Sequence, residues 1–226
     1  MRLSGILMGF KIWAMGNWKR ANGMVFLPFA FCLSPFALLV FMALFCNPAL
    51  AADYTQDLED FITAELKPWI NSDIVLDNLR LQNEASVDIS ESNLMVMDNN
   101  WRSEFRKVNQ PLIGQVLNSE LSAFLKKKLE EGQGVYTQIA IINNKGLNIA
   151  QTVVSDHYWN IGQPRWDKTF RQGSYATYIS DLYYSDETSK FQVEISFMII
   201  ADDQPVGILA AGIDVEQLED WKKRRQ

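Results

Sequence analysis

The chain has 226 residues, of which 27 are acidic and 21 basic, so its formal net charge is −6. Four of the basic residues and none of the acidic ones lie in residues 1–52, which leaves residues 53–226 with 17 − 27 = −10. A body this acidic argues against nucleic acid as a partner, because domains that bind nucleic acid are basic. Both cysteines, Cys32 and Cys46, also lie before residue 53, so the rest has no disulfide, thiol nucleophile or cysteine-based metal site.

Residues 1–52 have the pattern of an export leader. Basic residues precede an apolar run over residues 24–45, and small residues follow at positions 49, 51 and 52. This order predicts a signal peptide that is cleaved after Ala51 or Ala52, and hence a periplasmic protein. The apolar run is also long enough to span a bilayer, so an uncleaved inner-membrane anchor is the alternative.

Residues 53–134 are predicted to form a helical lead-in to the rest of the domain. Apolar residues at helical spacing indicate a first helix that ends near Pro68 and a second that runs to about Asn83. Asn71 or Ser72 is the expected cap of the second helix, and Ser90 opens a third. A fourth is expected from Pro111 to about residue 129, before the glycines at 132 and 134.

Residues 135–226 change to the period of two that is typical of strands. Strands are predicted over residues 136–142, 147–154, 175–181, 191–199 and 206–214, with a short helix over 167–172 and a last helix over 215–223. Short connections between them favour an antiparallel sheet with helices on one face, an α+β domain.

The fourth of these strands should present two different faces. Phe191, Val193, Ile195 and Phe197 are expected to pack on the helices, and Gln192, Glu194 and Ser196 are expected to face a pocket.

The segment over residues 155–166 is unusually rich in aromatic and charged side chains for a connection. It contains Tyr158, Trp159, Arg165, Trp166 and the only histidine, His157. Aromatic walls around one fixed cation suit a pocket for a small anionic or zwitterionic molecule. Alternatively, each tryptophan plugs the edge of the core, and Arg165 pins the loop through an acidic neighbour, Asp156, Asp167 or Asp181.

Enzymatic chemistry is not expected. One histidine supports no Ser-His-Asp arrangement, and the sequence contains no zinc-protease motif, phosphate-binding loop or dinucleotide fingerprint. Asp181, Asp186 and Glu187 lack the regular spacing of a calcium loop. No catalytic residue, metal site or cofactor is therefore predicted.

The chain resembles the extracytoplasmic PAS-like sensor domains called Cache or PDC domains, in their stand-alone exported form. The resemblance rests on the long helical lead-in, the Ile-Asn-Asn-Lys-Gly turn ending at Gly146, the Tyr158-Trp159…Arg165-Trp166 segment and the closing Gly-Ile-Asp at Asp214. It implies a central five-stranded antiparallel sheet, with the helices on one face and a ligand pocket on the other under residues 155–174.

The resemblance also implies roles for residues of the pocket. Arg165 would bind a carboxylate and Asp214 an ammonium group, with Trp166 and Tyr178 as walls. The full set of expected ligand-binding residues is Tyr158, Trp159, Arg165, Trp166, Tyr178, Asp181, Gln192 and Asp214.

Two functional classes follow. In the first, the protein is a periplasmic sensor module that binds a small polar organic molecule, carboxylate or amino-acid-like, and relays its occupancy to a membrane receptor or signalling protein. In the second, the fold has no ligand and serves only for docking in an interaction or assembly role. A homodimer through the N-terminal helices is a further expectation.

The leader generates a first prediction. The mature protein should begin at Ala52 or Asp53, because the small residues at positions 49, 51 and 52 form the cleavage site of a signal peptide. N-terminal sequencing of the protein recovered from the cell envelope tests this. Recovery of a chain that still contains residues 1–45 would instead establish the membrane anchor.

Overall fold

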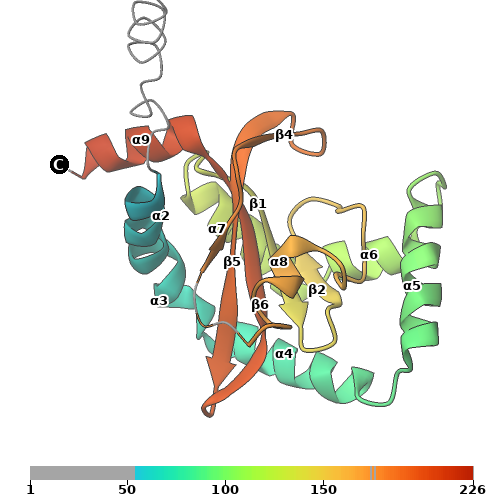
Figure 1. Cartoon of the computed structure of the whole chain (residues 1–226). Helices are drawn as coiled ribbons and strands as arrows, with labels where there is room; N and C mark the ends of the chain where they lie inside the picture. Colours follow the sequence, from blue (N-terminus) through green and yellow to red (C-terminus); the bar gives the residue numbers. More distant parts are fainter. Residues whose placement is uncertain (1–53, 174, 176, 226) are drawn as a thin grey trace, which may run out of the picture. The chain divides into compact units, whose positions relative to one another are not determined.

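The computed structural model describes residues 54–173, 175 and 177–225, so the predicted leader, its cleavage point and both cysteines lie outside the described residues. Within that described part, no helix is long and apolar enough to cross a membrane. The architecture is the predicted α+β arrangement, with a helical half followed by an antiparallel sheet and a closing helix (Figure 1).

The helical half is built from one segmented helix and four further helices within the described residues. These are α2 (Thr55–Phe61), η2 (Ile62–Leu66), α3 (Lys67–Ile70), α4 (Asp73–Ser86), α5 (Glu91–Glu104), α6 (Pro111–Leu117) and α7 (Glu120–Glu131). Ser72 is the N-terminal cap of α4 by position, and Ser90 caps α5 by accepting a hydrogen bond from the Asn93 amide. Both positions agree with the sequence pattern.

The first helix ends at Ile70, close to Pro68 as its sequence predicts, although a proline lies inside it. Proline has no amide hydrogen to bond the carbonyl four residues earlier. The chain accommodates this with the wider turn η2, in which the Lys67 amide donates to the Ile62 carbonyl five residues back. Pro68 then lies in the first turn of α3, where its missing donor costs least.

The single fourth helix predicted from Pro111 to about residue 129 is wrong, because α6 and α7 are separate. Ser119 caps α7 by accepting a hydrogen bond from the Ser122 amide, and its own hydroxyl donates to the Val116 carbonyl. A serine side chain that satisfies these end groups makes a new helix start favourable. The break also lets the Ser122 hydroxyl accept the Gln151 amide of the sheet.

The sheet is antiparallel throughout and has the order β2-β1-β6-β5-β3, with β4 paired to β5 off this path. Its strands are β1 (Tyr136–Asn143), β2 (Asn148–Gln151), β3 (Tyr178–Ile179), β4 (Tyr183–Ser185), β5 (Lys190–Ala201) and β6 (Gln204–Asp214). The expected five strands are present, and β4 is a sixth, which the sequence analysis missed. The helix α9 (Val215–Arg224) closes the chain as predicted.

Two strands end earlier than predicted for one shared reason. After β2, the Thr152 hydroxyl rather than a carbonyl receives the Ile139 amide. After β3, the Ser180 hydroxyl likewise receives the Glu194 amide. A hydroxyl that takes the place of a main-chain acceptor ends the regular ladder while leaving the amide satisfied.

The predicted helix over residues 167–172 is displaced toward the N-terminus. The helix observed is α8 (Pro164–Asp167), which starts at a proline because its fixed φ angle and missing amide suit a first helical turn. Residues 168–173 continue as turns. As a result, Arg165 and Trp166 lie on a helix instead of in an irregular loop.

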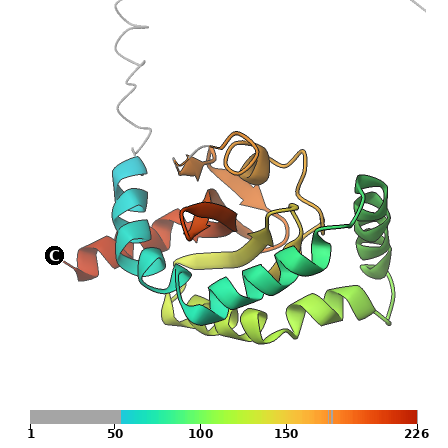
Figure 2. The same ribbon diagram turned by 90° about the horizontal axis from the view of Figure 1, so that it is seen from below.

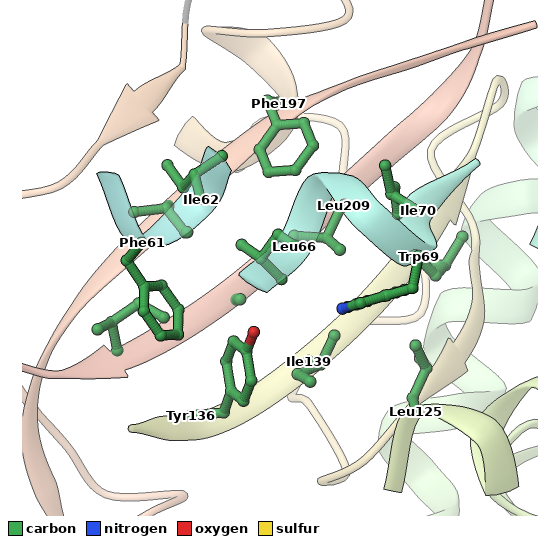
Figure 3. Close-up of a cluster of buried hydrophobic side chains, with 14 of the residues drawn as sticks. Phe61, Ile62, Leu66, Trp69, Ile70, Leu125, Tyr136, Ile139, Phe197 and Leu209 are labelled. Carbon is green, nitrogen blue, oxygen red and sulfur yellow. The ribbon is translucent and has the colours of Figure 1, made fainter. Parts of the chain in front are cut away.

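The two faces of the sheet are covered by different parts of the chain. Figure 2 shows α4 and α7 on one side of the sheet and the segment that contains α8 on the other. The helical side holds the main hydrophobic cluster, with residues of α2, η2, α3, α4, α7 and α9 against β1, β5 and β6. Figure 3 shows Phe61, Leu66 and Trp69 from the first helix packed with Ile139, Phe197 and Leu209 from the sheet.

The predicted faces of β5 are correct, apart from Phe191. Val193, Ile195 and Phe197 lie in the hydrophobic cluster, whereas Phe191 is 62% exposed and pairs edge-on with Tyr184 of β4. Phe191 lies near the start of β5, beside the short strand β4.

This difference gives a matched pair of substitutions on one strand face. Phe197→Ala should lower the free energy of unfolding by about 3–5 kcal/mol, because it opens a cavity in the main cluster. Phe191→Ala should cost about 1 kcal/mol or less, because it removes only an exposed aromatic contact. Urea unfolding of both variants measures the difference, and equal losses would contradict the assigned packing.

Candidate functional site

The face of the sheet opposite the helices carries buried polar side chains in its centre. Gln192, Glu194 and Ser196 alternate with the core residues of β5, and all three are buried. Residues directly opposite each other on paired strands share a face. Gln138 on β1 and Glu194 on β5 both oppose Gly212 of β6, so these polar groups are on a common surface.

Gly212 provides the room in the middle of this surface. A Cβ atom at residue 212 would lie 2.2 Å from the Thr137 hydroxyl oxygen and 2.9 Å from Nε2 of Gln192. The missing side chain lets Thr137 and Gln192 approach the β6 backbone from the two neighbouring strands. Any larger residue would push these polar groups apart.

Residues 152–173, which follow β2, cross over this polar face and form its cover. Two buried asparagines fasten the cover. The side-chain amide of Asn148 donates to the Ser155 hydroxyl and the His157 carbonyl, and that of Asn160 donates to the Gly146 carbonyl and to Asn148 Oδ1. The sequence analysis identified neither asparagine, although buried amides of this kind commonly fix loops by binding main-chain groups.

The tryptophans hold the cover to the β1–β2 turn. Trp159 donates its indole N–H to the Lys145 carbonyl at 2.9 Å. Trp166 is only 3% exposed and stacks on Phe170, in a small cluster that includes Met198 and residues of β1 and β6. Because the Trp166 side chain is buried in this cluster, it packs as part of the core. Its position agrees with the alternative considered from the sequence, in which the tryptophan plugs the edge of the core.

Tyr158 points into a different part of the molecule. It is buried and stacks on Trp101 of α5, with ring centroids 5.3 Å apart. Asp98 of the same helix accepts the main-chain amides of both Tyr158 and Trp159 and pairs with Arg102 at 2.8 Å. These contacts attach the start of the cover to α5.

Arg165 reaches the polar face of the sheet and meets a carboxylate. Its guanidinium lies 2.9 Å from the Glu194 carboxylate, and its main-chain carbonyl accepts the Ser196 hydroxyl. The three acidic partners considered from the sequence, Asp156, Asp167 and Asp181, are therefore wrong. The Nε atom of Arg165 is buried and has no hydrogen-bond partner among the described residues.

A small cavity opens beside Arg165, between the cover and the turn that joins β4 to β5. Its volume is about 150 Å³, and it is lined by Ser155, Asp156, His157, Asn160, Gln163, Arg165 and Glu187. We call it the loop pocket. Of the predicted ligand-binding residues, Arg165 lines the loop pocket. The other lining residues were not predicted; they are Ser155, Asp156, His157, Asn160, Gln163 and Glu187.

The remaining predicted site residues are engaged elsewhere. Asp214 caps α9 through the amides of Glu216 and Gln217, and it pairs with Lys190 at 3.1 Å. Gln192 is fully buried and donates to the Tyr183 hydroxyl. Tyr178 lies under the Lys168 ammonium, 4.8 Å from its ring centroid, and Asp181 is exposed. The structure does not bring these four residues to the loop pocket.

Two carboxyl groups at this site have displaced pKa values. Burial raises the pKa of Glu194, although the Arg165 guanidinium opposes the shift. Burial also raises the pKa of Glu187, with Arg165 again opposing and Asp156 adding to the shift. The Glu187 residue as a whole is exposed, but its carboxyl group lies in the pocket, where desolvation acts on it.

The Arg165–Glu194 pair generates a pH-dependent prediction. Arg165→Met leaves Glu194 buried without its cation, so the pKa of Glu194 rises further and its ionisation opposes folding. A folded-state pKa above the unfolded one gives stability that is lost as pH rises. We expect a loss of about 3–5 kcal/mol at about pH 8 and a smaller loss at about pH 5.

The double variant Arg165→Met/Glu194→Met is the control, because replacing both members of a buried pair is often neutral. Urea unfolding at the two pH values should show that it recovers most of the lost stability. A loss in the single variant that does not depend on pH would contradict a buried pair.

Within the described residues, no cluster of three or more His, Cys, Asp and Glu side chains is arranged to hold a metal ion. No known protein-family model matches the chain, and no curated protein matches it. Solved structures with a similar fold exist. They include the extracellular domain of a protein described as a histidine kinase, vpHK1S-Z8, with 14% identity, a TM-score of 0.40 and coverage of 74% of this chain and 54% of that one.

Two further similar structures are described as a sensor domain and a sensory domain. The sensor domain of the Vibrio cholerae histidine kinase DctB has 13% identity and a TM-score of 0.38, over 76% of this chain and 58% of that one. The sensory domain of the Campylobacter jejuni chemoreceptor Tlp3, with isoleucine bound, has 14% identity and a TM-score of 0.35, over 74% and 64%. This chain thus spans a little more than half to about two thirds of the length of these proteins.

Proposed function

We propose that this protein is an exported sensor module of the Cache or PDC type, which binds a small polar molecule in the loop pocket and relays its occupancy to a membrane signalling partner. The observation that carries the proposal is the loop pocket itself. It is a cavity of about 150 Å³ beside a largely buried arginine whose Nε atom has no partner among the described residues.

Buried polar groups without partners support this assignment. Leaving such a group unsatisfied costs about 1–3 kcal/mol, so each one in a native protein calls for an explanation. Of the four such atoms among the described residues, which belong to Ser72, Thr137, Gln151 and Arg165, only Arg165 Nε comes from a residue that lines the loop pocket. A polar occupant supplies the hydrogen bonds that the arginine lacks.

The size of the pocket restricts the class of occupant. Pockets for drug-sized ligands have volumes of about 300–1,000 Å³. The loop pocket is half that or less, so the occupant is a small polar metabolite with few heavy atoms. Larger hollows on the described surface, such as the one of about 530 Å³ lined by residues of α5 and α6, have no unpartnered buried polar atom among their lining residues.

The proposed transmission of ligand occupancy depends on the two segments that line the pocket, the cover and the β4–β5 turn. Asp156 and His157 come from the cover, which is attached to α5 through Asp98, and Glu187 comes from the β4–β5 turn. An occupant that contacts both segments restricts their relative motion. A change in this restriction is the signal that a membrane partner would detect.

A thermal-shift screen of small metabolites tests the proposal. A ligand raises the melting temperature in proportion to RT ln(1 + [L]/Kd), so binding should give a concentration-dependent increase. Gln163→Trp should abolish that increase by filling the pocket, whereas Gln82→Trp, on the exposed surface of α4, should leave it unchanged. A screen without any stabilising molecule would favour the docking role instead.

A further inference from the structure

We propose that the free edge of β4 is a docking site for an extended segment of a partner protein, which adds to the sheet as a further strand and carries basic residues beside apolar ones. The site is on the outer side of the hairpin formed by β4 and β5, at the end of the sheet from which α9 leaves (Figure 1). The inference goes beyond the proposed function, because it holds whether or not a metabolite occupies the loop pocket.

One edge of β4 has no partner strand. Within the part of the chain that the structure describes, β4 pairs with β5 alone, through Tyr183, Tyr184 and Ser185, and no further main-chain hydrogen bond reaches these residues. A strand at the edge of a sheet presents a row of unpaired amide and carbonyl groups. An extended peptide can bind such an edge by forming main-chain hydrogen bonds with it.

Exposed apolar side chains lie beside this edge. Tyr184 and Phe191 are directly opposite each other on the two strands, with ring centroids 5.2 Å apart, and they are 51% and 62% exposed. Leu182, two positions before Tyr184, is 49% exposed. Clustered exposed apolar groups with polar neighbours mark interaction sites. Because β4 has only three residues, its main chain offers few hydrogen bonds, and these side chains must supply much of the affinity.

The inner side of the hairpin is held in place by polar contacts. Gln192 is fully buried, and its side-chain amide donates to the Tyr183 hydroxyl while its side-chain oxygen accepts the Thr188 hydroxyl. The Ser185 hydroxyl accepts the Thr188 amide. These contacts fix the hairpin before a partner arrives, so docking requires little further ordering of this chain.

The charges beside the edge indicate the chemistry of the occupant. Asp181 precedes β4 and Asp186 follows it, and both residues are exposed and form no ion pair with another described residue. Lys190 of the facing strand does not offset them, because it pairs with Asp214 at 3.1 Å. A lysine or arginine on an added strand would lie near these carboxylates, and opposite charges on paired strands are stabilising.

The same charges disfavour a second copy of this chain as the occupant. Two β4 strands paired edge to edge would bring Asp181 and Asp186 of both copies, four carboxylates, together along one short stretch. Like charges on paired strands are destabilising. The acidic edge with its exposed aromatic residues is therefore complementary to a different protein, one with a basic and apolar segment.

Selection from a library of random short peptides tests the chemistry of the occupant. The purified protein, without added metabolite, is the target, and Asp181→Lys/Asp186→Lys is used to remove peptides that bind elsewhere. The selected peptides should have lysine or arginine beside valine, isoleucine, threonine or aromatic residues. Fluorescence anisotropy should show that the charge-reversed variant binds them about tenfold or more weakly.

Two further variants complete the set. Leu182→Ser/Phe191→Ser should also weaken binding about tenfold or more, because it removes apolar contacts from the docking surface. Glu84→Lys/Asp88→Lys makes the same charge reversal at two other exposed positions and should leave the affinity unchanged. All three variants change exposed side chains, so each should melt cooperatively near the temperature of the unaltered protein.

Hydrogen exchange shows whether a selected peptide adds as a strand. Binding should slow the exchange of amides in residues 182–186, because the free edge becomes paired. The amides of β2, at the opposite edge of the sheet, should exchange at an unchanged rate. A bound peptide that leaves residues 182–186 unprotected would contradict strand addition.

The other outcomes are equally decisive. The charge assignment is overturned if the selected peptides lack basic residues or bind Asp181→Lys/Asp186→Lys equally well, and the inference fails if no peptide is selected. A concentration-dependent dimer in sedimentation that Leu182→Ser/Phe191→Ser abolishes would identify a second copy as the occupant and overturn the proposal. The metabolite screen decides the proposed function separately, because none of these measurements contains a metabolite.

Discussion

The structure depends on the fact that β5 is buried on both faces while its sequence alternates between apolar and polar residues. Side chains of a strand point alternately to its two sides, so one strand contributes to both layers at once. Val193 and Ile195 complete the hydrophobic cluster against the helices, and Glu194 between them faces the cover. A carboxylate in that position requires a cation from the other layer, which explains why Arg165 must lie where it does.

The position of Arg165 in turn requires a cover with a fixed shape. A loop of this length loses considerable conformational entropy when it is ordered. The hydrogen bonds of Asn148 and Asn160, the two tryptophans beside Gly146 and the short helix α8 offset that loss. The loop pocket is the space that remains when these contacts have fixed the cover.

The fold could be predicted from the sequence because periodicity is a local property. Helix positions, the two faces of β5 and the final helix follow from the spacing of apolar residues and from capping residues such as Ser90. Three of the errors arose where a side chain replaces a main-chain partner. Ser119 starts a new helix, and Thr152 and Ser180 end strands by accepting amides from residues distant in sequence.

The candidate site was harder to predict because it depends on pairings between distant segments. The sequence singled out residues 155–166 as the notable connection, and in the structure Arg165 of this segment lines the loop pocket. The partner of Arg165 lies 29 positions later, and no spacing rule identifies Glu194. Tyr158 and Trp166 satisfied the pattern of an aromatic wall, yet they are core residues, because composition does not show which way a side chain points.

The strand β4 pairs with a neighbour on one edge only, and this affects how a partner protein could detect a ligand in the loop pocket. Within the described chain β4 pairs with β5 alone, so this hairpin has few neighbours to hold it closed. Its outer surface displays the aromatic pair Tyr184 and Phe191, while Glu187 in its turn reaches inward. The β4–β5 hairpin thus connects Glu187 in the interior to the exposed aromatic pair. A contact that restricts the motion of Glu187 would therefore also fix the geometry of that aromatic surface.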